Sequence, residues 1–273
     1  YVIVMSDGVA TVRATESCTP AFRDVDFYDE SAAIAVGDDG YSLVWNGSDW
    51  AYEYVGSNSD FYAVSATLWD EAFAVRSSGR IHEWDGDSWG YYDDVGWPTL
   101  YGVDVLDSST GFAVGSSGYV YEWDSSGNDW DWFDDAGYNT FYDVDLFDSS
   151  TAFASSNYGD VYEWDSSGND FDRVLDGPSW LDLYAVAVAS DSLAFALGES
   201  GRIYEWDGSS WGYREDKGSN SFRDAEFYDE SFGVAVGDGG WIYHWDGGSW
   251  DPVSSPVSSR SEEHTSELQS LLI

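Results

Sequence analysis

The sequence predicts an all-β protein, a β-propeller of four-stranded blades, from three observations. A tryptophan-containing phrase returns along the 273-residue chain at intervals of 39 to 42 residues. Each interval holds four short strand-like segments separated by Gly, Ser, Asn and Asp, and no stretch has helical periodicity. Units of about forty residues with four antiparallel strands are typical of propeller blades. The recurring tryptophans are Trp45, Trp84, Trp123, Trp164, Trp206 and Trp245.

One unit shows how the strands are expected to lie. FYDVDLF at 141–147 alternates, with Val144 and Leu146 on one face and Asp143 and Asp145 on the other. TAFAS, VYEW and DFDRVL follow as the second, third and fourth strands. The short links between them, such as SSG and WDG, favour tight turns in which Gly takes a positive φ. Because the tryptophan is present in every unit, we expect it to pack between adjacent blades.

Six whole units follow one another, and VIVMSDGVATVRA near the start aligns with the third and fourth strands of a further unit. We therefore expect six whole blades plus a half-blade, as in a truncated seven-bladed ring. Residues 260–270, RSEEHTSELQS, resemble the translation of a sequencing adapter, so the last segment is interpreted as non-native. The expected segments are 1–21 (outer strands of a truncated blade), blades at 22–60, 61–99, 100–140, 141–182, 183–221 and 222–257, and the tail 258–273.

The charge limits the partners and the solvent. Asp plus Glu number 52 against 10 Lys plus Arg, which gives a net charge of −42 spread over the whole chain. Such a chain repels nucleic acid, and it contains no apolar run of membrane-spanning length, so we expect neither nucleic-acid binding nor membrane insertion. The abundance of aspartate with a single lysine resembles proteins of salt-loving organisms and predicts a haloadapted protein. Cys18, the only cysteine, cannot form an internal disulfide.

The phrases GRIHEWDGDSWG at 79–90 and GRIYEWDGSSWG at 201–212 resemble the BNR/Asp-box propeller repeats of sialidase-like and photosystem II assembly-factor-like proteins. The WD ending of the third strand also resembles WD repeats. The resemblance covers residues 1 to about 257 and implies the propeller fold. A sialidase-like activity would require three clustered arginines, a Tyr/Glu pair and an acid/base Asp. No residue is carried over onto that set, because Arg23 and Arg223 are repeat equivalents, as are Arg80 and Arg202.

The first strand of each unit is predicted to be innermost, with its third and fifth residues near the axis. Four of the six units place at least one carboxylate there, which makes a cation-binding central channel conceivable, with Ca²⁺ as the ion. The interpretation we favour is that haloadaptation places aspartate wherever water reaches. The candidate channel carboxylates are Asp24, Asp26, Asp104, Asp143, Asp145, Asp224 and Glu226. No catalytic residue and no other cofactor is predicted.

These observations favour a non-catalytic, monomeric binding propeller that takes a protein or carbohydrate ligand on one face, at an extracellular or cell-surface location. Two alternatives stay open: a sialidase-like glycoside hydrolase and a structural surface or adhesin segment. A once-only cluster of Arg, Glu and Tyr at one mouth of the ring would favour the hydrolase. A uniform face would favour the structural role.

Overall fold

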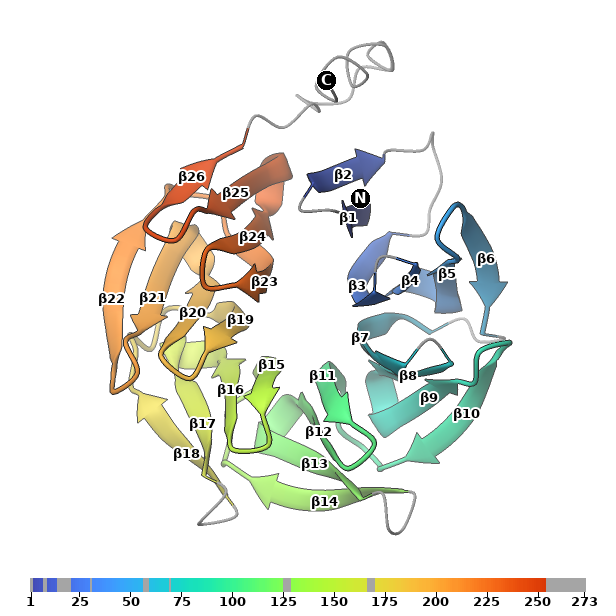
Figure 1. Cartoon of the computed structure of the whole chain (residues 1–273). Coiled ribbons are helices and arrows are strands. Elements are labelled where there is room, and N and C mark those ends of the chain that lie inside the picture. The colour runs from blue at the N-terminus through green and yellow to red at the C-terminus, as the bar shows by residue number, and fades with distance from the viewer. Residues whose placement is uncertain are drawn as a thin grey trace.

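The computed structural model describes residues 2–6, 9–13, 21–29, 31–55, 59–68, 70–124, 129–165 and 170–253. These residues form six four-stranded antiparallel sheets around a central channel, together with one two-stranded sheet (Figure 1). The predicted all-β propeller with six four-stranded blades is therefore confirmed. The predicted tail, 258–273, lies outside the described residues. Within the described ranges, no helix has the length and apolar character needed to cross a membrane.

The strands of every blade pair in chain order, from the innermost to the outermost. The first blade comprises β3 (Phe22–Asp29), β4 (Ala32–Gly37), β5 (Tyr41–Trp45) and β6 (Trp50–Tyr54). The second comprises β7 (Phe61–Leu68), β8 (Glu71–Arg76), β9 (Arg80–Trp84) and β10 (Trp89–Asp94). The third comprises β11 (Leu100–Asp107), β12 (Thr110–Gly115), β13 (Tyr119–Asp124) and β14 (Asp129–Asp135).

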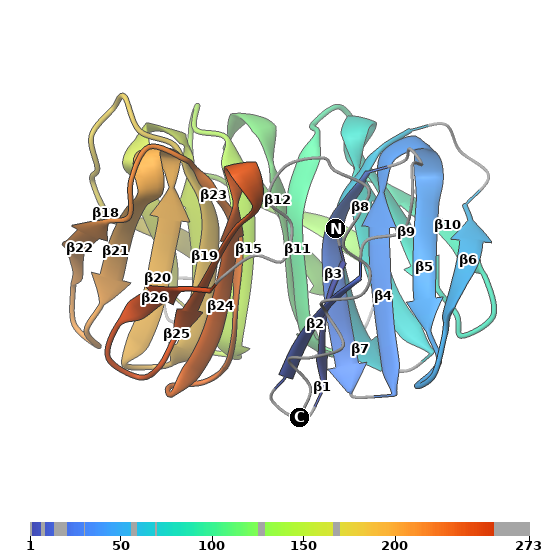
Figure 2. The same ribbon diagram turned by 90° about the horizontal axis from the view of Figure 1, so that it is seen from above.

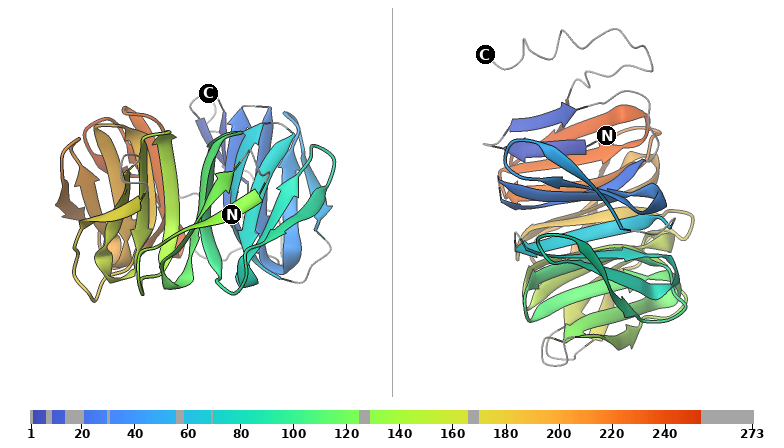
Figure 3. Two further views of the ribbon diagram at one scale, coloured as in Figure 1. Left: turned by 90° about the horizontal axis from the view of Figure 1, so that it is seen from below. Right: turned by 90° about the vertical axis from the view of Figure 1, so that its right-hand side faces the viewer.

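The remaining blades repeat this order, and the edge-on views show all six standing side by side (Figure 2, Figure 3). The fourth comprises β15 (Phe141–Asp148), β16 (Thr151–Ser156), β17 (Val161–Asp165) and β18 (Asp170–Leu175). The fifth comprises β19 (Leu183–Ser190), β20 (Leu193–Gly198), β21 (Arg202–Trp206) and β22 (Trp211–Asp216). The sixth comprises β23 (Phe222–Asp229), β24 (Phe232–Gly237), β25 (Trp241–Trp245) and β26 (Trp250–Pro252).

A three-residue 3-10 turn joins the second and third strands of each blade. Its last residue is always a glycine at positive φ, for example Gly79 at 60° and Gly118 at 75°. A Cβ at Gly118 would lie 2.4 Å from the carbonyl oxygen of Gly137, so the close approach of the next connection also requires glycine. The positive φ predicted for this turn is therefore confirmed.

The recurring tryptophan lies in the seam between two blades, as expected. The Trp123 ring is 5.0 Å from the Phe73 ring of the preceding blade, and Trp164 is 5.0 Å from Phe112 in the same way. The indole N–H of Trp123 donates to the carbonyl oxygen of Ser108 at 3.0 Å. One side chain thus packs against the neighbouring blade while it holds the first hairpin turn of its own blade.

The first and sixth blades flank an opening in the ring, and the two-stranded sheet lies in this opening (Figure 1). Its strands are β1 (Val2–Ser6) and β2 (Val9–Arg13), which pair with each other in an antiparallel manner. Trp45 beside the opening is half-buried, whereas its five equivalents are only 3–8% exposed. Val234 and Val236 on the sixth blade are likewise half-buried. The structure thus supports six blades and does not support the expected half-blade of a seven-bladed ring.

Replacing repeat-equivalent tryptophans measures how far each seam is closed. We expect Trp123→Ala to lower the free energy of unfolding by about 3–5 kcal/mol, because it empties a fully packed seam. We expect Trp45→Ala to cost about 1–2 kcal/mol, because part of that ring already contacts water. Urea unfolding of the two variants beside the wild type measures both values. Equal losses at the two positions would show that the opening is filled in solution.

Candidate binding face and central channel

The ring has two faces of different construction. The connection face carries the six 3-10 turns and the connections from one blade to the next. The two kinds of segment lie side by side on it, since Ser116 N donates to Thr99 O at 2.9 Å and Glu199 N to Asp182 O at 2.9 Å. The hairpin face carries the turns between first and second strands and between third and fourth strands.

The turns of the hairpin face are acidic. Its turn sequences contain no Lys, Arg or His. Several of its aspartates accept hydrogen bonds within their own turns, as Asp107 does from the Ser109 hydroxyl and backbone N–H, both at 2.7 Å. These donors hold the pKa of Asp107 below its usual value, and Ser150 lowers the pKa of Asp148 in the same way. Arg214 reaches this face from β22 and donates to Gly248 O at 2.6 Å.

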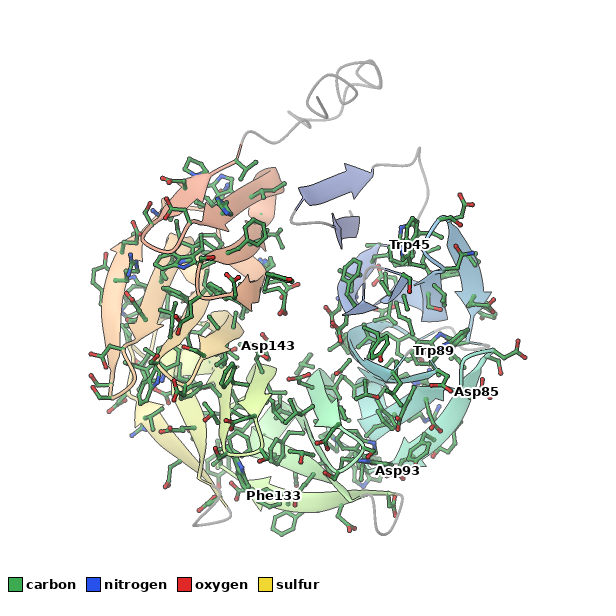
Figure 4. The ribbon with its side chains drawn as sticks, in the orientation of Figure 1. Trp45, Asp85, Trp89, Asp93, Phe133 and Asp143 are labelled. Carbon is green, nitrogen blue, oxygen red and sulfur yellow. The ribbon has the colours of Figure 1, made fainter. Side chains whose placement is uncertain are left out.

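Five of the seven predicted channel carboxylates link one blade to the next. Asp24 accepts the N–H of Val25 in its own strand and the N–H of Val64 in the following blade, each at 2.7 Å. Figure 4 shows Asp143 at the inner edge of the ring, and its Oδ2 accepts the N–H of Val186 at 2.9 Å. The same cross-blade bond, at 2.6–2.8 Å, joins Asp26 to Ala66, Asp104 to Leu146 and Asp145 to Val188.

The two carboxylates of the sixth blade differ from the other five. Asp224 accepts the N–H of Ala225 in its own strand at 2.8 Å. Within the described part of the chain, neither Asp224 nor Glu226 is bonded to a following blade. Asp224 is half-buried and Glu226 is exposed to the channel. All seven residues share one repeat pattern in the sequence. In the structure, five of them bond to the next blade, and Asp224 and Glu226 do not.

The crowding of these groups makes the channel carboxylates weaker acids. Removal from water, and then the nearby Asp26, raise the pKa of Asp104 to about 6, and burial likewise raises the pKa of Asp224 to about 6. Burial and the neighbouring acids raise the pKa values of Asp24, Asp143 and Asp145 well above the usual range. Enclosure by the surrounding ring, and then the nearby Asp145, do the same for Glu226, although its side chain is open to the channel.

This arrangement gives the channel a structural role. In five of the seven carboxylates, backbone N–H groups of the next blade bond to oxygens that a metal ion would otherwise use. Among the residues the structure describes, no group of three or more His, Cys, Asp or Glu is arranged to hold a metal ion. Binding of Ca²⁺ in the channel stays a prediction from the sequence.

An arc of tyrosines surrounds the channel mouth on the connection face. They occupy the second position of four successive innermost strands: Tyr62, Tyr101, Tyr142 and Tyr184. Neighbouring rings in this tyrosine arc are 5.1–6.0 Å apart. A guanidinium lies over each end of the arc, Arg23 at 5.1 Å from Tyr62 and Arg223 at 4.5 Å from Tyr184. The mouth is therefore aromatic and rigidly packed.

A once-only Tyr, Glu and Arg combination lies at one end of this arc. The Tyr184 hydroxyl donates to Glu199 Oε1 at 3.3 Å, under Arg223. Burial and the Glu199 charge raise the pKa of Tyr184, which opposes its use as a nucleophile. Arg223 is paired with Asp238 at 2.9 Å, and Arg23, on the far side of the opening, is paired with Asp38. The two arginines thus lie at opposite ends of the arc, and the side chains that the structure describes do not assemble them into the arginine triad of sialidases.

Exposed aromatic residues gather on the connection face and were missed by the sequence reasoning. Trp97 and Tyr138 are each 98% exposed, Trp180 is 63% exposed and Tyr158 is 48% exposed. The first three lie in successive inter-blade connections, at 95–99, 136–140 and 176–182, and Tyr158 lies in the 3-10 turn η4 (Asn157–Gly159). We call these four residues the aromatic patch. The corresponding connection at 217–221 reads KGSNS, so the aromatic residues do not follow the repeat.

Hydrogen bonds join the parts of the aromatic patch around the fourth blade. Asn157 N donates to Thr140 O at 3.0 Å, which holds the turn against the connection that carries Tyr138. Tyr158 N donates to Asp182 Oδ1 at 3.4 Å, near the connection that carries Trp180. Tyr138, Tyr158 and Trp180 therefore belong to one continuous surface. Trp97 lies one blade away on the same face.

No protein-family model and no curated protein matches the chain. Several solved structures do match the chain. The structure of YCF48 bound to a D1 peptide is 19% identical, with a TM-score of 0.67 over 85% of this chain and 80% of that one. YCF48 from Cyanidioschyzon merolae is 19% identical, with a TM-score of 0.66 over 87% and 86%. The WD40 repeats of RRP9 are 11% identical, with a TM-score of 0.72 over 88% and 82%. These likenesses establish the class of fold, a β-propeller.

The two kinds of channel carboxylate should respond differently to neutralisation. Ionisation of Asp224 in the crowded channel destabilises the folded protein because its pKa is raised, and this loss of stability disappears as pH falls from about 6 to below the ordinary aspartate pKa. Asp224→Asn should therefore raise the free energy of unfolding at pH 8 by about 1 kcal/mol, allowing for water in the channel, and have little effect at about pH 3. Chemical unfolding at both pH values measures this difference.

Asp24→Asn is the matched control at the equivalent repeat position. Its single amide oxygen can accept only one of the two backbone N–H groups that Asp24 holds, so the variant should be less stable than the wild type at about pH 3. At pH 8 the lost hydrogen bond offsets the relief of charge, because the pKa of Asp24 is also raised, so any gain should be smaller than for Asp224→Asn. If Asp24→Asn were as stable as the wild type at about pH 3, the assignment of Asp24 to the cross-blade bond would be wrong.

Proposed function

We propose that this protein is a non-catalytic binding module that takes a protein partner on its connection face. The observation that carries the proposal is the aromatic patch, whose large exposed rings depart from the repeat. Scaffold residues recur in every blade, whereas three of these rings lie in successive inter-blade connections and the fourth lies in the turn η4. Exposed aromatic residues of this kind are enriched where proteins bind other proteins.

The comparison with solved structures supports the same proposal. One similar propeller, YCF48, was solved with a D1 peptide bound. The connection face is also not uniform, which argues against a purely structural surface or adhesin role. The hydrolase alternative lacks an assembled arginine triad. A carbohydrate ligand is the alternative occupant of the exposed rings.

A displayed peptide library selected on the immobilised protein tests the proposal. We expect enriched peptides whose affinity falls at least about tenfold in the patch variant, Trp97→Ala/Tyr138→Ala/Trp180→Ala, because the removed rings supply the contact area. The outer-strand variant, Tyr52→Ala/Tyr91→Ala/Trp132→Ala, removes three rings that are at least half exposed on the outermost strands β6, β10 and β14. It should bind as the wild type does. Peptides that bind both variants alike, or no enrichment at all, would refute the proposal.

For the ring itself, we propose closure by a seventh blade that includes β1 and β2. Three observations support it: the half-buried Trp45, the half-buried valines of the sixth blade, and the absence, among the described residues, of cross-blade partners for Asp224 and Glu226. In each closed seam, equivalent residues are buried or bonded to the next blade. A further innermost strand beside β23 would supply the backbone N–H groups that Asp224 and Glu226 lack.

We also propose that the protein is adapted to high salt. Its net charge of −42 repels itself unless ions screen it, and the Debye length falls from about 10 Å at 0.1 M to about 3 Å at 1 M salt. The melting temperature should therefore rise as KCl increases from about 0.1 M to 1 M, measured by circular dichroism. A melting temperature that is constant or falls over this range would contradict the adaptation.

A further inference from the structure

We infer that the partner segment bound by the aromatic patch is cationic and extended, with Arg or Lys side chains that stack on the exposed rings. The inference rests on the binding function proposed above and adds the chemistry of the partner. Three features support it: the exposed rings of the aromatic patch, the carboxylates near them, and the stacking of Arg202 on Trp180.

On the connection face, an arginine of the chain itself already stacks on aromatic rings. The Arg202 guanidinium lies 5.6 Å from the Trp180 ring and 4.9 Å from the Tyr213 ring. The same group pairs with Asp216 at 2.7 Å. Arg202 is thus held by two rings and one carboxylate, an arrangement in which a cation keeps both its charge partner and its stacking.

The exposed rings offer an incoming side chain the same combination. Trp97 and Tyr138 are almost fully exposed, so their faces can accept a guanidinium or ammonium group. Carboxylates accompany the aromatic patch: Asp176 is 77% exposed at its side chain beside Arg173, and Asp182 accepts hydrogen bonds from Tyr142 and Tyr158. A cation placed on a ring would therefore also meet negative charge.

The cations of this face do not provide a site for an anionic segment. Five of them are each paired with a carboxylate at 2.6–3.8 Å: Arg23 with Asp38, Arg80 with Asp94, Arg173 with Asp160, Arg202 with Asp216 and Arg223 with Asp238. The net charge of −42 adds a long-range field that attracts cations and repels anions. Charge complementarity therefore selects a basic partner.

The conformation of Tyr158 supports a binding role for this region. Its φ is +64°, a value that is costly for a bulky side chain. The equivalent residues in the other turns are Asp39, Ser78, Ser117, Ser200 and Gly239. An aromatic ring, 48% exposed, is therefore held at a position where other blades carry Asp, Ser or Gly.

Two synthetic peptides distinguish charge from shape. One alternates Arg and Gly, and the other has every Arg replaced by citrulline, which keeps the planar group and removes its charge. By isothermal titration calorimetry in about 0.15 M KCl, we expect the arginine peptide to bind at least about tenfold more tightly than the citrulline peptide. In the patch variant the arginine peptide should lose about tenfold in affinity, although that variant changes no charge. The outer-strand variant should bind it as the wild type does.

Three other outcomes would overturn the cationic assignment, and one of them would also overturn the protein-binding function. Equal binding of the two peptides would overturn the cationic assignment, and the proposed protein-binding function would survive if library peptides still depend on the patch. Equal affinity of the arginine peptide for wild type and patch variant would also overturn it, because binding would then follow the overall charge. Retention of the wild type, and not the patch variant, on a neutral polysaccharide without peptide binding would overturn both proposals in favour of a carbohydrate ligand.

Discussion

The junction between neighbouring blades is the interaction on which the rest of this structure depends. A four-stranded sheet cannot bury both of its faces alone, so each blade is stable only against the next. Two devices make the junction: a tryptophan packed on the aromatic residue of the preceding blade, and an inner-strand aspartate that accepts a backbone N–H of the following blade. The first supplies apolar burial near the outer strands, and the second fixes the register near the axis.

The aspartate device has an electrostatic cost that shapes the chemistry of the molecule. It concentrates carboxylates around a narrow channel, where burial and mutual repulsion raise their pKa values. On the hairpin face the opposite happens, because turn hydrogen bonds lower the pKa values of Asp107 and Asp148. The same residue type is thus a weak acid at the axis and a strong one in the turns. The connection face is left as the surface where aromatic rings and paired cations vary from blade to blade.

The repeat allowed the blades, their strands and the seam tryptophans to be predicted from the sequence, because every unit restates the same pattern. The role of Asp24 could not be predicted, because its partner Val64 is 40 residues away and the bond depends on the register between blades. The aromatic patch was missed for a different reason. Residues that recur in every unit belong to the scaffold. Trp97, Tyr138 and Trp180 lie in connections whose sequences differ from unit to unit, so they form no part of the repeated pattern. Aligning the connections VGWPT, AGYNT and DGPSWLD with KGSNS would have revealed them.

The cross-blade bonds described above all join residues 40 to 43 positions apart, and none of them ties distant parts of the chain together. Although the shape is circular, the energetics are those of a linear array with nearest-neighbour coupling. A defect in one blade is felt by the two blades beside it and decays beyond them. Surface residues on one group of blades can therefore change without destabilising the blades on the opposite side of the ring.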